Sequence, residues 1–275
     1  MKSRLAVPDA VFVKPLLFGL EKDSSPFELV FDIPARNALK LSERSEGIRS
    51  AFLSPIDYAR HGAEYCLVPK ICVASSLKSN TIQLFLNADV RNIERIAIDI
   101  RYTSEIILAK IIIAEKYRNQ KTHHDLQFIP MMPDLDAMLA KADAALIVND
   151  IPKFYSDIFS LDLVEEWNDL TDLPYVHGFW VSREEELIEL EAQALITAKE
   201  QGVSLRKEII HSVAQQKNIS IAELERYLSL FTFEMGSVEE ESLSEFMHYA
   251  FFYGVIGDIP DIRFFDISDE NFLKN

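Results

Sequence analysis

Two adjacent hydroxyl side chains stand where a helix is expected to begin after a strand. Thr103 and Ser104 follow an apolar strand that ends near Asp99, and they open an isoleucine-rich segment. The first turn of a helix leaves backbone N–H groups without intrahelical partners, so these groups and the two hydroxyls can hold a carboxylate. The pair predicts an anion site, and its alternative role is a plain N-cap.

Four further side chains supply donors for such an anion. Ser75 and Ser76 would donate from the other side of the site, while Arg101 or Lys14 would neutralise a second carboxylate through charge-assisted hydrogen bonds. The whole chain carries a formal charge of -16, so an anion site needs its donors concentrated locally. The same charge argues against a nucleic-acid partner, whose affinity depends largely on Lys and Arg.

The sequence lacks the common motifs for nucleotide, metalloprotease and hydrolase chemistry. It contains no G-x-G-x-x-G, G-x-x-x-x-G-K-[ST], H-E-x-x-H or G-x-S-x-G. Cys66 and Cys72 have neither the spacing of a metal clip nor that of a disulfide framework, and we expect buried thiols. His123 and His124 fall in a polar segment and indicate a solvated loop. We expect no metal ion and no cofactor.

Membrane insertion and export are not indicated by the sequence. No stretch approaches the roughly 18 consecutive apolar residues of a membrane helix. Asp9 and Lys14 interrupt what would be the apolar core of a signal peptide. We therefore expect a cytoplasmic protein.

Short apolar runs alternate with helical stretches through the first two thirds of the chain, which predicts an α/β fold with a mainly parallel sheet. A helix is expected over Ser104 to Tyr117, because its apolar face is too wide for a surface helix. The expected strands are Arg4 to Val7, Glu28 to Phe31, Ala51 to Leu53, Thr81 to Leu86, Arg95 to Ile98, Leu126 to Ile129, Ala145 to Val148 and Tyr175 to Val181.

The last hundred or so residues read mostly as helix. Three segments there open with the S-x-x-E capping pattern, namely Ser182 with Glu185, Ser220 with Glu223 and Ser237 with Glu240. Gly202 and Gly236 are expected to end the first two of these helices. A strand-rich front and a helical tail predict two lobes, one of residues 1–87 plus 180–275 and one of residues 88–179, joined by two crossing strands.

Several segments together resemble the chorismate dehydratase family of the futalosine pathway of menaquinone biosynthesis and its relative, dihydroxynaphthoate synthase. The longest, D-L-V-E-E-W-N-D-L-T-D-L-P-Y-V-H-G-F-W from Asp162 to Trp180, is similar to that family's D-L-x-x-x-W-x-x-x-T-G-L-P-F-V-x-A-x-W. The others are A-D-A-A-L-I-V-N-D from Ala142 to Asp150, the N-terminal segment from Arg4 to Leu20, Ser54-Pro55-Ile56-Asp57-Tyr58, Leu67-Val68-Pro69, and Asp99 with Thr103-Ser104.

The resemblance implies a two-lobed fold like that of type II periplasmic binding proteins, with a helical C-terminal tail. It also implies a small anionic ligand and the removal of water from chorismate to give an enolpyruvyl-substituted benzoate. The expected substrate-binding residues are Phe12, Lys14, Ser54, Ser75, Ser76, Arg101, Thr103, Ser104 and Asn149. Asp150 is the candidate catalytic residue, because a carboxylate desolvated in a closed cleft has a raised pKa; a structural cap is its alternative role.

This chain departs from the family pattern at positions that bear on activity. Phe12 stands where the family has an asparagine that points into the cleft, and Asn149 replaces a glycine. The catalytic histidine of the naphthoate synthase branch is missing from Val148-Asn149-Asp150, which argues against that activity. Asp172 replaces another glycine, in an expected turn, where Asp tolerates the required backbone.

Three functions are compatible with these residues. A chorismate dehydratase-like lyase is the first hypothesis. The second is a non-catalytic protein of the same fold that binds a small carboxylate, either for uptake or as a sensor; Phe12 favours it and the missing signal peptide opposes it. The third is an enzyme acting on a different small molecule.

Overall fold

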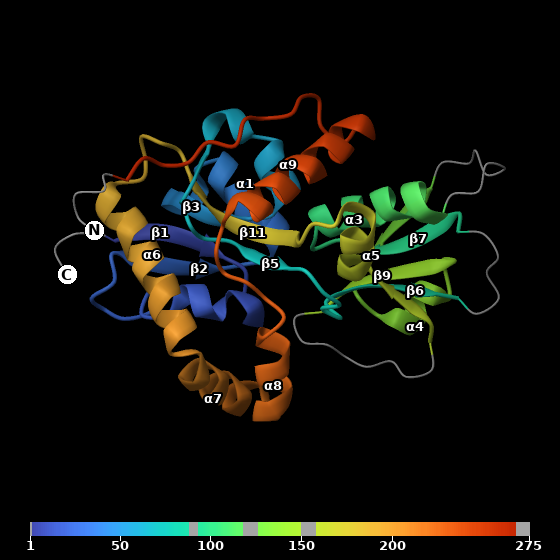
Figure 1. The fold of residues 1–275 in the computed structure, drawn as a ribbon, viewed down its shortest axis with the longest axis horizontal. Coiled ribbons are helices and arrows are strands. Elements are labelled where there is room, and N and C mark those ends of the chain that lie inside the picture. The colour runs from blue at the N-terminus through green and yellow to red at the C-terminus, as the bar shows by residue number, and fades with distance from the viewer. Residues whose placement is uncertain (1, 88–92, 118–125, 150–157, 268–275) are drawn as a thin grey trace.

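The protein is described by a computed structural model that covers residues 2–87, 93–117, 126–149 and 158–267. Its strands form two separate sheets, and we call the body built on each sheet lobe I and lobe II (Figure 1). The strands are β1 (Ser3–Val7), β2 (Phe27–Phe31), β3 (Ile48–Leu53), β4 (Cys66–Leu67), β5 (Val73–Ser75), β6 (Ile82–Leu86), β7 (Arg95–Asp99), β8 (Gln127–Met131), β9 (Ala144–Val148), β10 (Ser160–Asp162) and β11 (Tyr175–Ser182).

The sheet of lobe I has the order β2-β1-β3-β11-β4, and β5 pairs with β11 outside this path. The pairs β1/β2 and β1/β3 are parallel, whereas β11 is antiparallel to its neighbours. The sheet of lobe II has the order β10-β6-β9-β7-β8, with β7 parallel to both neighbours and β6 antiparallel to both of its own. Both sheets are therefore mixed rather than mainly parallel.

The chain passes twice between the sheets, once after β5 and once before β11. Because β6 belongs to the second sheet and β11 to the first, the crossings fall earlier than the sequence-based boundaries at residues 87 and 180. We therefore propose to divide the lobes before β6 and before β11. Figure 1 shows β5 and β11 side by side in the middle of the molecule.

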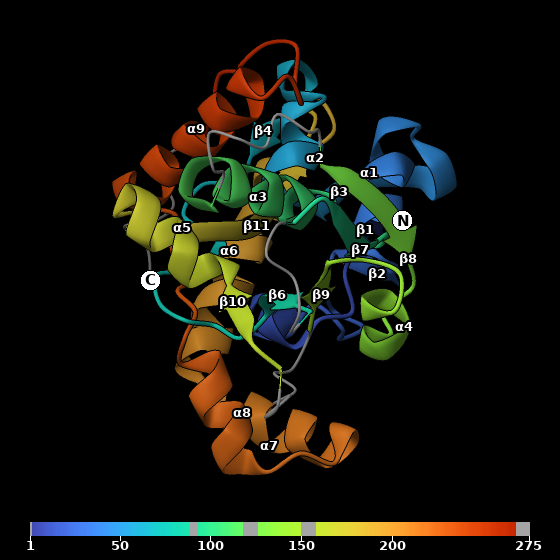
Figure 2. The ribbon, with the colours of Figure 1, turned by 90° about the vertical axis from the view of Figure 1, so that its right-hand side faces the viewer.

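Helices cover both sheets. They are α1 (Pro34–Ser42), α2 (Pro55–Ala59), α3 (Ser104–Ile112), α4 (Leu135–Leu139), α5 (Leu163–Thr171), α6 (Glu189–Ser204), α7 (Arg206–Lys217), α8 (Ile221–Leu228) and α9 (Ser237–Phe252), with a 3-10 helix at Val11–Leu17 and a π-helical turn at Ile113–Tyr117 after α3. Figures 1 and 2 place α7 and α8 at the opposite end of the molecule from α9.

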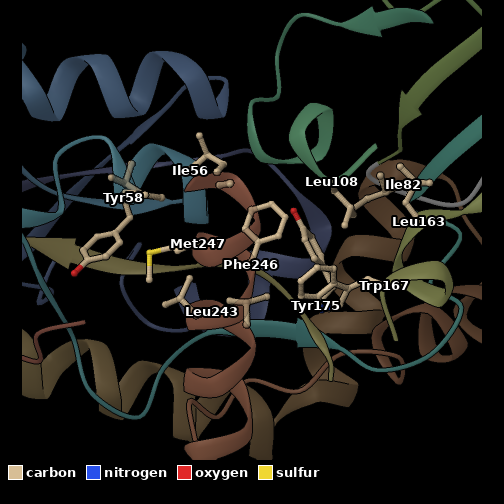
Figure 3. Packing of buried hydrophobic residues seen from close by; sticks show 14 of the residues in the cluster. Ile56, Tyr58, Ile82, Leu108, Leu163, Trp167, Tyr175, Leu243, Phe246 and Met247 are labelled. Carbon is tan, nitrogen blue, oxygen red and sulfur yellow. The ribbon is translucent and has the colours of Figure 1, made fainter. Parts of the chain in front are cut away.

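The described residues form three apolar clusters, of which the smallest packs α4 on the sheet of lobe II, and the other two are larger. One packs α6, α7 and α8 against β1 and the 3-10 helix of lobe I. The other is shared by the lobes: Trp167 of α5 and Leu108 of α3 meet Ile56 of α2 and Phe246 of α9 around Tyr175 of β11 (Figure 3). Because burying one large apolar side chain stabilises the fold by roughly 1.5–3 kcal/mol, this shared cluster fixes how the lobes meet.

Local sequence signals predicted some helix ends correctly and others not. Ser220 and Glu223 form the expected capping box at α8. Asp172 takes the left-handed conformation after α5, with φ 59°. The expected helix start at Ser182 is wrong, because Ser182 ends β11 and its hydroxyl bonds to the carbonyl of Arg49.

The two glycines expected to end helices do not do so. Gly202 lies inside α6, where a Cβ would collide with the backbone of Pro15, so the missing side chain permits close packing. Gly236 is the N-cap of α9, and its backbone N–H donates to the carboxylate of Glu239. That cap lies one residue before the predicted Ser237 with Glu240. Cys66 and Cys72 are buried free thiols, as predicted.

Candidate functional site

Ser54 and Ser104 bring the N-termini of two helices from different lobes into contact. Ser54 is the N-cap of α2 in lobe I, and Ser104 is the first residue of α3 in lobe II. The backbone N–H of Ile56 donates to the Ser104 hydroxyl over 2.9 Å, and that hydroxyl donates to the Ser54 hydroxyl over 2.8 Å. Both serines are buried. The hydroxyl of Ser104 therefore joins the lobes, and α3 has no side-chain cap from Thr103.

This chain of hydrogen bonds ends on a buried carboxylate. The Ser54 hydroxyl donates to Asp57 Oδ2 over 2.7 Å, and the side chain of Thr103 bonds to the same carboxyl group. Burial raises the pKa of Asp57 above its usual range, although the bonds from Ser54 and Thr103 counter part of the increase. Of the residues predicted from the sequence, Ser54 and Thr103 thus bond to Asp57 directly, and Ser104 is linked to it through Ser54.

Glu105, the next residue of α3, adds a second carboxyl group at the same junction. Its side chain is buried, and within the described part of the chain its Oε2 has no hydrogen-bond partner. Burial raises the pKa of Glu105 to about 8, and the nearby Asp57 and Asp99 add to the increase. Because like charges close together in a buried site disfavour ionisation, Glu105 is mostly a neutral acid at pH 7.

A second group of side chains lies on the two strands that connect the lobes. Ser75 of β5 stands opposite Tyr175 of β11, and the pairing shifts by one residue between Val176 and Gly178. His177 is therefore the extra residue of a β-bulge, a feature that redirects side chains. Its Nε2 lies 2.7 Å from the Ser75 hydroxyl oxygen.

Aromatic rings surround this histidine. The ring of Tyr175 lies 5.0 Å from it, that of Phe231 5.4 Å and that of Phe12 5.7 Å, measured between ring centroids. Burial lowers the pKa of His177 to about 3, so the imidazole is neutral near pH 7. Phe12 also stacks on Phe231 at 5.7 Å. Phe12 thus packs between His177 and the tail residue Phe231, and its role in binding a substrate stays a prediction.

Tyr175 lies between the two groups. Its ring contacts the ring of His177. Its hydroxyl is close enough to the carboxylates of Glu105 and Asp57 for their negative charges to disfavour its ionisation. Burial raises the pKa of Tyr175 well above its usual value. Figure 3 shows the hydroxyl pointing into the gap between Phe246 and Leu108. Tyr175 thus connects the bulge on β11 to the start of α3.

The other predicted site residues have different surroundings. Arg101 makes a two-pronged ion pair with the fully buried Asp99, through Nε at 2.9 Å and Nη2 at 2.6 Å. Lys14 pairs with Asp9 at 3.2 Å and lies over the ring of Phe31. The predicted cations are therefore matched by carboxylates of the chain itself. A ligand anion would need these donors released, and the anion site stays a prediction.

Ser76 and Asn149 lie in two further environments. Ser76 is exposed, unlike its neighbour Ser75. The backbone N–H of Asn149 bonds to the carbonyl of Thr81 over 2.8 Å, and its side-chain Nδ2 is buried without a partner among the described residues. Asp150, the predicted catalytic residue, lies outside the described residues.

Sequence reasoning missed His177 and Glu105. His177 occupies a position where the family pattern is variable, and one isolated histidine carries no spacing signal. For Glu105 a signal existed, because a single acid stands in an otherwise apolar helix start next to Ser104.

Among the described residues, no group of three or more His, Cys, Asp or Glu is arranged to hold a metal ion. Over the same residues, no helix combines the length and apolar character needed to cross a bilayer.

Two mixed sheets, two connecting strands and a helical tail define the fold of periplasmic binding proteins, and solved structures share it. A protein of Archaeoglobus fulgidus superposes with a TM-score of 0.72 at 18% identity, covering 93% of this chain and 98% of that one. The aliphatic sulphonate binding protein SsuA of Escherichia coli gives 0.62 at 14% identity, covering 94% of each chain. A Candida albicans protein described as having the generic periplasmic binding protein fold gives 0.66 at 12% identity, covering 98% and 99%.

Sequence comparison assigns the chain to a family within this class. The model of the menaquinone (vitamin K2) biosynthesis family matches residues 4–251, so the chain belongs to that family. A chorismate dehydratase of Thermus thermophilus is 23% identical over 256 residues, which are 88% of this chain and 93% of the relative. The family resemblance inferred from the sequence is thereby confirmed.

Proposed function

We propose that the chain is a chorismate dehydratase-like lyase. The observation that carries this proposal is the similarity to the Thermus enzyme along almost the whole of both chains, within a family assigned to menaquinone biosynthesis. The structural neighbours add only the fold, because their identities are 18% or lower. We also propose a cytoplasmic location, since the relative is a biosynthetic enzyme.

The proposed reaction needs little covalent help from the protein. A proton leaves the ring carbon that bears the enolpyruvyl ether, hydroxide leaves the neighbouring carbon, and the ring becomes aromatic. The protein would orient the dianion, exclude water and stabilise developing charge. Ser54, Thr103 and Ser104 meet at the start of two helices, and such helix starts favour negative charge.

The test is direct. The purified full chain is mixed with chorismate, and the aromatic proton signals of the product are followed by NMR, with a protein-free incubation as control. Growth of those signals only with protein, together with loss of one water by mass spectrometry, supports the proposal. Asp150→Asn shows whether that carboxylate takes part. Intact chorismate after long incubation with folded protein would refute the lyase.

A binding protein without turnover is the alternative. The aromatic contact of Phe12 with His177 and Phe231, where the family has a polar asparagine, is the observation in its favour. Calorimetry separates the two functions, because heat of binding without any product formation would identify a binder.

A further inference from the structure

Ser75 and His177 form a buried polar contact between β5 and β11, the strands that join the lobes. The two side chains are 1% and 6% exposed, and 2.7 Å separates Ser75 Oγ from His177 Nε2. The contact exists because a β-bulge places His177 out of register with β5. At Gly178, the next residue, the backbone lies close to β3, since a Cβ there would lie 2.7 Å from the carbonyl oxygen of Leu53.

A neutral imidazole has one N–H, and its position decides what Ser75 can do. If Nε2 carries the proton, it donates to Ser75 Oγ, and the serine proton is free to point elsewhere. If Nδ1 carries it, Nε2 accepts the serine proton, and Ser75 offers only lone pairs. A carboxylate accepts hydrogen bonds and cannot donate them, so Ser75 can bind a carboxylate only with the first tautomer.

The surroundings of His177 keep it neutral. Tyr175, Phe231 and Phe12 face its ring, and burial alone lowers its pKa to about 3. No charged group contributes to this shift among the described residues. The imidazole therefore carries one proton on one nitrogen near neutral pH.

We infer that His177 is a positioning residue: its Nε2–H donates to Ser75 and thereby turns the Ser75 hydroxyl proton toward a carboxylate oxygen of the ligand. This inference rests on the proposed function for the identity of the ligand, a cyclic carboxylate. It assigns the role to a residue that the family pattern leaves variable. His177 acts through Ser75 and does not itself take part in the removal of water.

The first test is NMR of the free full-length chain with ¹⁵N-labelled histidine, which distinguishes the two tautomers by the shifts of Nδ1 and Nε2. His177→Gln identifies its signals, and His248→Gln, at an exposed histidine of α9, is the control. Protonation at Nε2 is expected. Protonation at Nδ1 would overturn the inference whether or not chorismate is the substrate.

The second test is calorimetry with the dehydration product of chorismate, which the enzyme would not consume. Ser75→Ala is expected to weaken binding about tenfold to a hundredfold, the usual loss for a hydrogen bond to a charged group. His177→Phe keeps a ring in the aromatic enclosure but removes the donor, and a smaller loss than that of Ser75→Ala is expected, because the Ser75 hydroxyl remains but is no longer oriented. His177→Gln keeps a donor to Ser75 and should bind within about threefold of the unchanged protein.

The double variant Ser75→Ala with His177→Phe separates positioning from a purely structural effect. If His177 acts through Ser75, the double variant binds no more weakly than Ser75→Ala alone. Losses that multiply would refute the inference, as would unchanged binding in His177→Phe. If the unchanged protein does not bind the product, the proposed function fails, and the NMR result still decides the tautomer.

Discussion

The hydroxyl of Ser104 donates to the hydroxyl of Ser54 over 2.8 Å, although the two residues belong to different lobes and different helices. The same Ser104 oxygen accepts from the backbone N–H of Ile56. The Ser54 oxygen thus occupies the acceptor position at Ser104 that a ligand carboxylate oxygen would take. Binding of an anion at this point requires it to replace these bonds, so affinity and lobe contact are linked.

Replacing both Thr103 and Ser104 by Ala is expected to lower the free energy of unfolding by about 1–3 kcal/mol, because the backbone N–H of Ile56 and the carboxylate of Asp57 lose partners. Urea titration measures this loss, with Ser229→Ala, an exposed serine, as control. Affinity for the dehydration product should fall by a similar or larger amount. Earlier melting with unchanged affinity would show that the pair only joins the lobes.

The raised pKa of Glu105 predicts that the free energy of unfolding depends on pH. Its pKa rises from an ordinary 4.5 to about 8 on folding, since it is buried and faces Asp57 of α2, Asp99 of β7 and Tyr175 of β11. Between these values the folded state holds more protons than the unfolded state, so stability falls as pH rises from about 4.5 to about 8. The loss is on the order of a few kcal/mol.

Glu105→Gln removes this titration while keeping the shape of the side chain. Its free energy of unfolding, measured in urea at a series of pH values, should fall less steeply with pH than that of the unchanged protein. Arg101 stays paired with Asp99 in both proteins, so their difference reports Glu105. Parallel curves for the two proteins would mean that Glu105 is ionised in the folded state.

The eight strands expected from the sequence are all present, because each is an apolar run bounded by polar residues. The strands that were missed, β4, β5 and β10, have two or three residues each, too few to show a period. One of them, β5, carries Ser75. The sequence analysis predicted too much parallel pairing, because a segment of buried residues does not show the direction of the strand beside it.

The candidate site was predicted only in part, for a similar reason. Thr103 and Ser104 form a local signal, a strand followed by a helix start, and Ser54 belongs to a matched segment. Their partners are long-range: Ser54 and Ser104 are 50 residues apart, and Ser75 and His177 are 102 apart. The bulge at His177 comes from strand pairing, which no spacing within one strand reveals. The pairing of Arg101 with Asp99 was local and was overlooked.

Arg101 is expected to stabilise the fold through Asp99. Asp99 is fully buried, and Arg101→Ala would leave it without its ionic partner, at a cost of about 3 kcal/mol. Urea unfolding of Arg101→Ala and of the double variant with Asp99→Asn tests this. The double variant should recover part of the loss because the unpaired charge is gone. Equal losses in the two would assign the effect to packing of the Arg101 side chain.

Gly178 of this chain should not tolerate a larger residue, although the family pattern has alanine here, because its backbone lies against Phe52 and Leu53 of the neighbouring strand β3. A Cβ there would lie 2.7 Å from the carbonyl oxygen of Leu53 and collide with the ring of Phe52, which itself packs edge-on against Trp180. Since neither neighbour can move without disturbing β3 or the core, Gly178→Ala is expected to cost about 1–3 kcal/mol. The displaced bulge should also move His177 away from Ser75 and weaken binding of the dehydration product.

Gly257 offers the matched control, because a Cβ at that position meets no atom within 4 Å. Gly257→Ala should change the free energy of unfolding by less than about 0.5 kcal/mol. Urea unfolding and calorimetry on both variants make the comparison, and ¹⁵N NMR of His177 shows whether its contact with Ser75 survives. A Gly178→Ala protein as stable as Gly257→Ala, with the histidine signals unmoved, would show that β11 accommodates the methyl group and that the bulge does not depend on glycine.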